Sequence, residues 1–416
     1  MDYFHYNEDQ LLAEDVPITS ITEKFGTPCF IYSKAALENN YLAYRQAFEG
    51  HPHLICFAVK ANSNLAVLNV LANLGAGFDI VSGGELSRVL AAGGNPNKVI
   101  FSGLGKTTAE ICEGLDADIH CFNVESEAEL ERINEVALSK HKIAPVSIRV
   151  NPDVDAETHP YISTGLKENK FGVSAEPAFE LYKRAMIMRG IRVTGIDFHV
   201  GSQLTSVGPF LNALDRVLQM NAQLSKEGIS IKHIDIGGGL GVTYDNEEPP
   251  TPHELVSLIK RKFSDLDLTI IIEPGRSIAA NAGILVSRVE YLKSHEGKNF
   301  AIVDGAMNDL IRPALYGAWQ KIITVNKAPN NNALPYEVVG PICESADFLG
   351  KNRILDIKPG DLLAVHSAGA YGFVMSSNYN SRPRAPEIMV NGNQVHLIRG
   401  RETVTDLFRN EYLLPV

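Results

Sequence analysis

The sequence predicts an α/β fold, in which a (β/α)8 TIM-type barrel is joined to a second, all-β domain. Two observations lead to this prediction. Between Leu54 and Ile272, short apolar or β-branched runs alternate eight times with segments of helical period. From about Ile284 the pattern changes to alternating strands separated by turn signals. A doubly wound open sheet remains the competing arrangement for the first part.

The expected elements follow in chain order. Barrel strands are expected at 54–59, 78–81, 99–101, 119–122, 146–150, 193–200, 233–236 and 268–272. Helices are expected at 65–74, 85–92, 178–188 and 210–224, with others that start near Pro252 and after Ser126, which Glu129 supports as an N-cap. Strands of the second domain are expected at 301–303, 336–339, 362–365 and 387–392. The expected domain limits are 28–282 for the barrel, and 1–27 with 283–416 for the β domain.

Composition excludes several classes of protein. The 416 residues are 45% hydrophobic and 21% charged, as in ordinary globular proteins, and the net charge of -11 opposes binding to nucleic acid. The N-terminus lacks the basic and apolar regions of a signal peptide, and no apolar run reaches membrane-spanning length. No C-x-x-C pair occurs, so we expect no metal site and reduced thiols in a cytoplasm. The cysteines are Cys29, Cys56, Cys112, Cys121 and Cys343.

Candidate site residues, both reactive side chains and glycine-rich backbone, stand where the predicted strands end, which is where a (β/α)8 barrel carries its chemistry. These residues are Lys60, Asp79, His199, Ser202, Gly237, Gly238, Gly239, Glu273, Pro274, Gly275 and Arg276. Lys60 follows a largely apolar run, which favours the neutral amine that can form a Schiff base. A strand-end lysine that extends its ammonium into water is the alternative.

The glycine-rich segment 237–241 predicts a site for a single phosphate. Glycines let backbone N–H groups approach an anion closely, and barrels often bind phosphate after strands seven and eight. A dinucleotide-binding loop fails on spacing, because the segment contains no G-x-G-x-x-G and continues into Thr243-Tyr244-Asp245 rather than a helix. A plain turn is the other alternative.

Six segments occur in the order of a known family: 58–62, 198–203, 237–241, 273–276, 340–347 and 368–372. They resemble the motifs of the fold-type III decarboxylases, which depend on pyridoxal 5'-phosphate and share the alanine racemase fold. The resemblance implies Lys60 as the Schiff-base lysine, His199 stacked on the cofactor ring and Glu273 on the pyridine nitrogen. The further cofactor contacts that it implies are Asp79, Ser202, Gly238, Gly239, Pro274, Gly275, Arg276 and Tyr371.

Glu273 distinguishes decarboxylation from racemisation within this fold type. A carboxylate against the pyridine nitrogen keeps that nitrogen protonated, which makes the ring an electron sink for the carbanion that decarboxylation leaves. The related alanine racemases place an arginine there, so Glu273 argues against racemisation. A structural pairing of Glu273 with Arg276 is the alternative.

Two further segments, 304–317 and Cys343-Glu344-Ser345, are similar to those of the diaminopimelate decarboxylase family. Ornithine-type relatives have aspartate after the cysteine. The resemblance implies decarboxylation of meso-2,6-diaminopimelate to L-lysine and carbon dioxide, the last step of lysine biosynthesis. The far end of this substrate carries an ammonium and a carboxylate, which charged and hydroxyl groups can bind. The implied substrate residues are Arg276, Arg312, Tyr316, Glu344 and Tyr371.

Cys343 would protonate the α-carbon after carbon dioxide leaves, a role that suits a thiol with a pKa near ~8.5. The resemblance implies a homodimer in which Cys343 and Glu344 reach the partner's barrel. Open alternatives are a decarboxylase of ornithine, arginine or carboxynorspermidine, and a non-catalytic cofactor-binding regulator. The long segment 151–172 is expected to act as a lid, with ordinary surface variation as the alternative.

Overall fold

The computed structural model describes residues 3–154, 170–327 and 331–415. The chain divides into two compact units, a barrel unit and a β unit. The barrel unit comprises 38–243 and 247–278, and the β unit comprises 1–37, 244–246 and 279–416. A closed barrel and a separate set of sheets confirm the predicted fold class. The central part of the predicted lid, 155–169, lies outside the described residues.

The barrel is closed by eight parallel strands in chain order, and β12 returns to pair with β5. Its strands are β5 (His53–Ala58), β6 (Gly77–Ile80), β7 (Val99–Phe101), β8 (Cys121–Val124), β9 (Ala144–Arg149), β10 (Ile191–Asp197), β11 (His233–Asp235) and β12 (Thr269–Ile272). Most of these residues are buried, as expected for a parallel sheet whose outer face is covered by helices. The open sheet is therefore excluded.

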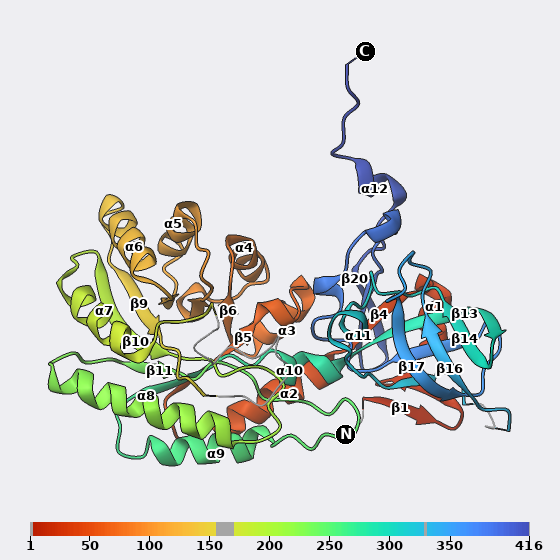
Figure 1. Cartoon of the computed structure of the whole chain (residues 1–416), viewed down its shortest axis with the longest axis horizontal. Helices are drawn as coiled ribbons and strands as arrows, with labels where there is room; N and C mark the ends of the chain where they lie inside the picture. Colours follow the sequence, from red (N-terminus) through yellow and green to blue (C-terminus); the bar gives the residue numbers. More distant parts are fainter. Residues whose placement is uncertain (1–2, 155–169, 328–330, 416) are drawn as a thin grey trace. The chain divides into compact units, whose positions relative to one another are not determined.

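Helices connect successive strands and surround the barrel (Figure 1). They are α2 (Lys34–Ala47), α3 (Leu65–Asn73), α4 (Gly83–Ala91), α5 (Thr108–Asp116), α6 (Glu127–Ser139), α7 (Ala175–Ile187), α8 (Gly208–Lys226), α9 (Pro252–Lys262) and the short α10 (Arg276–Ala279). The Ser126 hydroxyl accepts a hydrogen bond from the Glu129 N–H, so the predicted cap of α6 is confirmed. Among the helices that the structure describes, none combines the length and apolar character needed to cross a bilayer.

The interior of the barrel changes character along its length. At one level it is apolar, with Cys56 and Ile271 in a buried cluster. In β10, a Cβ at Gly195 would lie 2.1 Å from Nε2 of the buried His233, so only glycine leaves room for this imidazole. Two residues further along β10 the buried side chain is the carboxyl group of Asp197. Further buried carboxyl groups lie toward the C-terminal ends of the barrel strands. We call these ends the barrel mouth.

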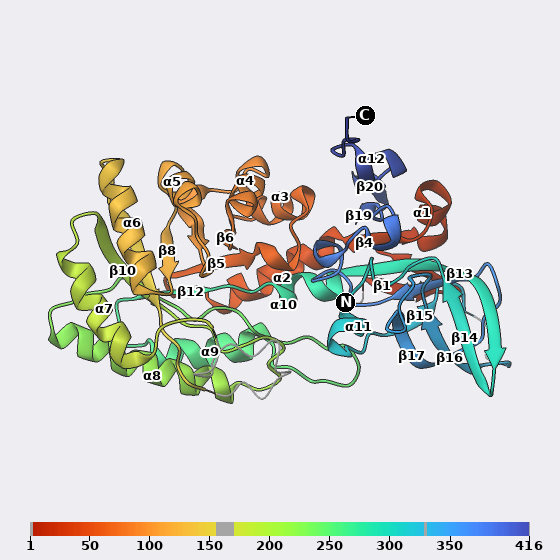
Figure 2. The same cartoon turned by 45° about the horizontal axis from the view of Figure 1, so that its top comes forward.

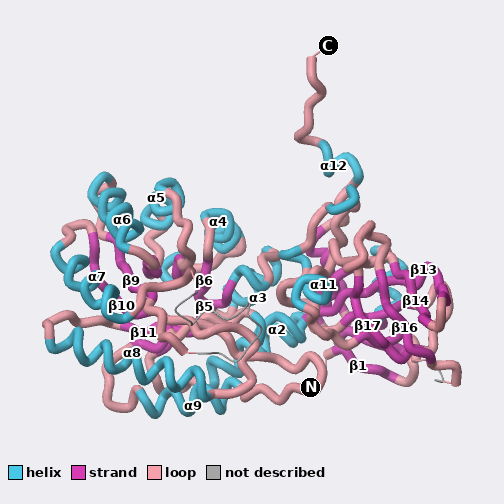
Figure 3. Tube along the Cα trace, viewed as in Figure 1, coloured by secondary structure: helices cyan, strands magenta, loops and turns pink. Residues whose placement is uncertain are grey.

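The β unit is built on a large sheet with the strand order β17-β16-β14-β13-β4-β19-β20, to which β18 and β15 are joined. The long strand β13 (Gly283–His295) pairs with β14, β18 and β4, and Figure 2 shows it beside β14. The other strands, magenta in Figure 3, are β4 (Cys29–Ser33), β14 (Lys298–Val303), β15 (Ile322–Thr324), β16 (Leu334–Val339), β17 (Phe348–Leu355), β18 (Leu362–Val365), β19 (Glu387–Asn391) and β20 (Gln394–Arg399).

Smaller elements complete the β unit. A three-stranded antiparallel sheet is formed by β1 (Phe4–Asn7), β2 (Gln10–Ala13) and β3 (Val16–Pro17). The helices are α1 (Ile18–Phe25), α11 (Arg312–Tyr316) and α12 (Val404–Phe408).

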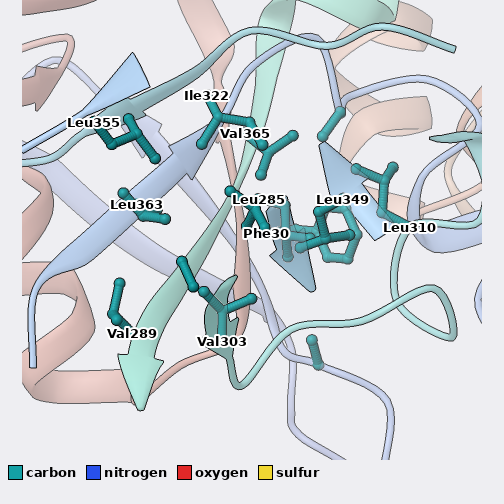
Figure 4. Packing of buried hydrophobic residues seen from close by; sticks show 14 of the residues in the cluster. Phe30, Leu285, Val289, Val303, Leu310, Ile322, Leu349, Leu355, Leu363 and Val365 are labelled. Atoms are coloured by element: carbon teal, nitrogen blue, oxygen red, sulfur yellow. The ribbon is translucent and has the colours of Figure 1, made fainter. Parts of the chain in front are cut away.

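Side chains from distant parts of the chain form the main core of the β unit. Phe30 of β4, Leu285 of β13 and Val365 of β18 belong to one buried cluster (Figure 4). The ring of Phe373 meets Phe30 edge to face, with the ring centroids 5.9 Å apart.

Leu285→Ala should lower the free energy of unfolding by about 2–5 kcal/mol, because Leu285 is 0% exposed and its truncation leaves a cavity. Leu397→Ala on β20, where the leucine is 51% exposed, is the matched control and should change stability far less. Urea unfolding followed by circular dichroism measures both variants. Equal losses of stability in the two variants would refute this placement of the core.

Candidate active site

Lys60 lies just past the end of β5, in the single 3-10 turn Val59–Ala61. Its Nζ forms an ion pair with Oδ2 of Asp79 in β6 at 2.7 Å, and the lysine side chain is 41% exposed while that of Asp79 is fully buried. From the apolar run before Lys60, the sequence predicted a neutral amine at this position. That prediction is wrong, because a buried carboxylate lies against it. The ion pair instead fixes the amine at the barrel mouth.

The backbone after β11 approaches neighbouring chain segments too closely for any side chain. A Cβ at Gly238 would lie 2.2 Å from the carbonyl oxygen of Glu273. Gly239 has a φ of 121°, and its Cβ would lie 2.3 Å from the carbonyl oxygen of Gly201. Glycine is therefore required at both positions. The glycines bring backbone N–H groups to the barrel mouth, as a phosphate site requires.

One of these N–H groups orients His199, which follows β10. The Gly238 N–H donates to Nδ1 of His199 at 3.2 Å, so the ring proton of the neutral imidazole resides on Nε2. Burial, followed by the positive charges of Arg149 and Lys60, holds the pKa of His199 well below its usual range. His199 therefore presents an uncharged ring at neutral pH.

Three buried carboxylates from successive strands meet beneath the barrel mouth: Asp197 of β10, Asp235 of β11 and Glu273 after β12. Carboxylate oxygens from all three lie within 4.8 Å of one another. Ser102 Oγ donates to Oε1 of Glu273 at 3.4 Å. Burial, followed by the neighbouring carboxylates, raises the pKa of Glu273 well above its usual range. Burial also raises the pKa of Asp197 well above its usual range and that of Asp235 to about 6.

A buried cation favours ionisation of only part of this cluster. Arg149 of β9 donates from Nη1 to Oε1 of Glu125 at 3.1 Å, and its Nε lies 3.9 Å from Oδ2 of Asp197. Within the described part of the chain, Oδ1 of Asp79 and Oδ1 of Asp197 are buried without a hydrogen-bond partner. The cluster therefore fits a ligand that brings a proton or a positive charge, such as a protonated pyridine nitrogen.

The predicted phosphate residues Arg276 and Ser202 lie together. Arg276, the first residue of α10, is buried and donates from Nε and Nη2 to Oγ of Ser202 at 3.2 and 3.0 Å. The carbonyl oxygen of the adjacent Pro274 accepts a hydrogen bond from the N–H of Ala58, which ties this segment to β5. A Cβ at Gly275 would lie 3.0 Å from that of Ala58. Guanidinium, hydroxyl and backbone N–H groups are the usual donors to a phosphate.

The other predicted residues belong to the β unit. Arg312 begins α11, is buried, and places its guanidinium carbon 4.5 Å from the centroid of the Tyr244 ring. Tyr316 ends the same short helix and is partly exposed. Tyr371 has a φ of 56°, a left-handed conformation that is uncommon outside glycine and recurs at functional positions.

Cys343 and Glu344 are exposed neighbours between β16 and β17. The Cys343 N–H donates to Oδ1 of Asn380 at 2.8 Å. The Tyr379 hydroxyl donates to Oε1 of Glu344 at 2.5 Å. The structure thus brings together the predicted barrel residues in one unit, and the predicted acid thiol and substrate carboxylate in the other.

Sequence reasoning did not identify Asp197, Asp235 and Arg149 as part of the barrel mouth. A signal was available, because a charged residue inside a short apolar strand is costly unless it is paired or used. Tyr379 and Asn380 were also missed. No local pattern distinguishes these two, since their contacts to residues 343 and 344 depend on the tertiary fold.

Comparison with known proteins adds family relationships to this geometry. Residues 34–280 match the pyridoxal binding domain of the pyridoxal-dependent decarboxylases. The chain is 58% identical to diaminopimelate decarboxylase of Pseudomonas aeruginosa, and 57% identical to that of Vibrio cholerae. Both alignments cover 100% of this chain and 100% of the relative.

Solved structures of the same family have the same fold. Diaminopimelate decarboxylase of Helicobacter pylori in complex with L-lysine superimposes with a TM-score of 0.92 at 42% identity, over 95% of this chain and 99% of that one. The enzyme of M. jannaschii in complex with L-lysine gives a TM-score of 0.95 at 38% identity, over 100% and 98%. These similarities confirm the fold-type III architecture.

Asp235→Asn should change how stability depends on pH in the cofactor-free protein. The folded pKa of about 6 exceeds the ordinary value of 3.8, so the carboxylate destabilises the fold increasingly as pH rises through this window. Relative to wild type, the variant should therefore gain roughly 2.4 kcal/mol in unfolding free energy between pH 4 and pH 7. The asparagine oxygen can still accept the hydrogen bond from the Gly237 N–H.

Chemical unfolding of both proteins at several pH values measures this difference. Asp118→Asn, at a side chain that is 74% exposed, controls for the loss of a carboxylate as such. A stability difference between Asp235→Asn and wild type that is independent of pH would show that Asp235 titrates normally.

Proposed function

The chain belongs to the diaminopimelate decarboxylase family of pyridoxal-dependent enzymes, and we propose that it converts meso-2,6-diaminopimelate to L-lysine and carbon dioxide. This reaction is the last step of lysine biosynthesis. The observation that carries the proposal is the meeting of an amine, a buried carboxylate and a guanidinium at one barrel mouth, from Lys60, Glu273 and Arg276. These groups match the aldehyde, ring nitrogen and phosphate of pyridoxal 5'-phosphate.

Each end of the cofactor has a group suited to hold it. Lys60 would bind the aldehyde carbon covalently, and the neutral ring of His199 would lie on the cofactor ring. Arg276 and Ser202 would bind the phosphate. Backbone N–H groups of Gly239 and Gly275 and the hydroxyl of Tyr371 complete the proposed phosphate site. Asp79, Gly238 and Pro274 complete the proposed contacts to the cofactor.

Glu273 would set the protonation of the ring nitrogen. Bound pyridoxal phosphate supplies an electron sink for the bond between the α-carbon and its carboxylate. Glu273 would accept a hydrogen bond from the protonated nitrogen, and the adjacent carboxylates of Asp197 and Asp235 would keep the proton there by their negative charge. The buried, acidic surroundings support this role.

Arg312 and Glu344 would bind opposite charges at the far end of the substrate. The guanidinium of Arg312 is buried against Tyr244, which gives it a fixed direction for the distal carboxylate. Glu344 would accept the distal ammonium. Arg276, Tyr316 and Tyr371 complete the proposed substrate contacts. Ornithine lacks a distal carboxylate, so a site with both charges would select diaminopimelate.

Cys343 would donate the proton that replaces carbon dioxide at the α-carbon. Its thiol is exposed, as a proton donor to a bound substrate must be. We further propose a homodimer in which the thiol and Glu344 act in the partner's site. The barrel unit would bind the cofactor, and the β unit would carry the substrate and dimer contacts. A cytoplasmic location agrees with five free cysteines.

Purified protein incubated with pyridoxal phosphate and meso-diaminopimelate should release carbon dioxide and L-lysine in equal amounts, and Lys60→Ala should abolish this activity. Borohydride reduction should leave the pyridoxyl group on the peptide that contains Lys60. Lys98→Ala, which removes a lysine that donates a hydrogen bond to the Gly75 carbonyl oxygen, is the control and should remain active. Pyridoxyl label on another lysine, or unchanged activity of Lys60→Ala, would contradict the assignment.

Arg312→Leu should reduce kcat/KM for meso-diaminopimelate about thirty- to several-thousand-fold. The variant keeps apolar bulk but leaves the distal carboxylate without its partner, and such truncations cost ~2–5 kcal/mol. Cofactor absorbance should persist, because the proposed cofactor ligands are unchanged. Arg409→Leu, at a side chain that is 70% exposed, is the matched control. If kcat/KM of Arg312→Leu stays within a few-fold of wild type, Arg312 does not bind the distal carboxylate.

Mixing inactive Lys60→Ala with inactive Cys343→Ala should restore activity if each site combines one residue from either subunit. Hybrid dimers would then contain one intact site, so up to about a quarter of wild-type activity is expected after random exchange. Subunit exchange is followed independently with differently tagged proteins. Exchange without any recovery of activity would place both residues in the site of a single subunit.

A further inference from the structure

Recognition of the substrate by Glu344 requires that an exposed carboxylate be held in one orientation. Both Cys343 and Glu344 lie on the surface between β16 and β17, where a long side chain normally samples several rotamers. A binding site needs its polar groups fixed to a fraction of an ångström. The surrounding residues of the β unit supply such a restraint.

The backbone of this segment is tied down by a buried side chain. Oδ2 of Asp347 accepts the Ile342 N–H at 2.8 Å, and Oδ1 accepts the Met307 N–H at 2.7 Å. The N–H of Asp347 donates in turn to the carbonyl oxygen of Glu344 at 3.2 Å. These bonds fix the path of the chain, but they leave the side chain of Glu344 unrestrained.

Two consecutive residues of a distant turn contact Cys343 and Glu344 directly. The Tyr379 hydroxyl donates to Oε1 of Glu344 at 2.5 Å. Oδ1 of Asn380 accepts the Cys343 N–H at 2.8 Å. The turn therefore restrains the carboxylate through one residue and the backbone beside the thiol through the next.

The turn is itself held in an uncommon conformation. Asn380 has φ 55° and ψ 29°, in the left-handed region that asparagine tolerates better than most residues. Asn378 Nδ2 donates to the carbonyl oxygen of Arg382 at 3.0 Å and to Oε2 of Glu402 at 2.7 Å. Glu402 also accepts hydrogen bonds from Arg384. An uncommon backbone conformation held by several bonds is typical of a functional position.

A phenol is suited to orienting a carboxylate that must keep its charge. The hydrogen bond to Glu344 raises the pKa of Tyr379 above its usual value, so the hydroxyl remains a neutral donor at physiological pH. It occupies one of about four acceptor positions of the carboxylate. An arginine or lysine at this position would neutralise the charge on Glu344, whereas the phenol leaves that charge for an ammonium.

We propose that Tyr379 is a specificity-determining positioning residue, which orients the carboxylate of Glu344 toward the ammonium at the far end of the substrate. Asn380 supports it by fixing the backbone at Cys343. This inference rests on the proposed function, which assigns that ammonium to Glu344.

Two small ligands isolate the effect of this ammonium. L-lysine contains the half of meso-diaminopimelate that is not decarboxylated, and 6-aminohexanoate is the same molecule without the α-ammonium. Isothermal titration calorimetry of each ligand into the cofactor-loaded protein gives a ratio of dissociation constants without any catalytic turnover. The proteins compared are wild type, Tyr379→Phe, Glu344→Gln, the double variant, and Tyr412→Phe as a control at a 92% exposed tyrosine.

Wild type and Tyr412→Phe should bind L-lysine at least about tenfold more tightly than 6-aminohexanoate, as expected for a hydrogen bond between charged groups. Tyr379→Phe should lower this ratio about three- to tenfold by weakening L-lysine alone, whereas general damage to the fold would weaken both ligands equally. The double variant should resemble Glu344→Gln, because Tyr379 acts through Glu344.

Two contradicting results are distinguishable. If Glu344→Gln lowers the ratio and Tyr379→Phe does not, Tyr379 has no part in recognition and the inference is overturned while the proposed substrate site stands. If Glu344→Gln also leaves the ratio unchanged, the assignment of the ammonium to Glu344 fails, and the inference fails with it.

Discussion

A cluster of buried carboxyl groups that resist ionisation, at the barrel mouth, is the constraint on which the rest of the site depends. Asp197, Asp235 and Glu273 bring carboxylates within 4.8 Å of one another in a low-dielectric interior, where ionisation of each raises the cost of ionising the others. The positive charges of Arg149, near Asp197, and of Lys60 favour ionisation of these groups in part. The interior therefore favours a group that brings a positive charge or a proton, as we propose for the ring nitrogen of the cofactor.

Backbone geometry builds this arrangement. The glycines after β11 allow the chain to pass directly beside the carbonyl oxygen of Glu273, and that path places the Gly237 N–H on Asp235 and the Gly238 N–H on His199. The orientation of the imidazole and the position of one carboxylate therefore follow from the same close approach. In the β unit, by contrast, an exposed segment is fixed by side chains, and the restraint comes from Asp347 and Tyr379.

Much of the fold was predictable from the sequence, because parallel strands buried on both faces leave apolar runs at regular intervals. Helix α5 was missed although Thr107 and Glu110 form a capping box that marks its start. The long strand β13 was also missed, although Ile284, Leu285 and Val286 give its buried first half an apolar run; its second half is largely exposed and lacks such a pattern. At the site, Lys60 and Glu273 were predictable because they follow the ends of predicted barrel strands. The ion pair of Lys60 and the turn at Tyr379 depend on contacts between distant residues, which no local pattern encodes.

The most direct test of the central claim is the pH dependence of the stability gained on binding pyridoxal phosphate, measured between pH 5 and 8 for wild type and Glu273→Gln. In the cofactor-free wild type, raised carboxylate pKa values make unfolding easier as pH rises, by up to about 1.4 kcal/mol per pH unit for each proton released. A cation beside Glu273 should relieve this loss, so the stability gained on binding should increase with pH. The proposed covalent bond between the cofactor and Lys60 is the same in both proteins, so its own pH dependence cancels in the comparison. Glu273→Gln should therefore show a clearly weaker increase, and identical pH dependence in the two proteins would contradict the claim.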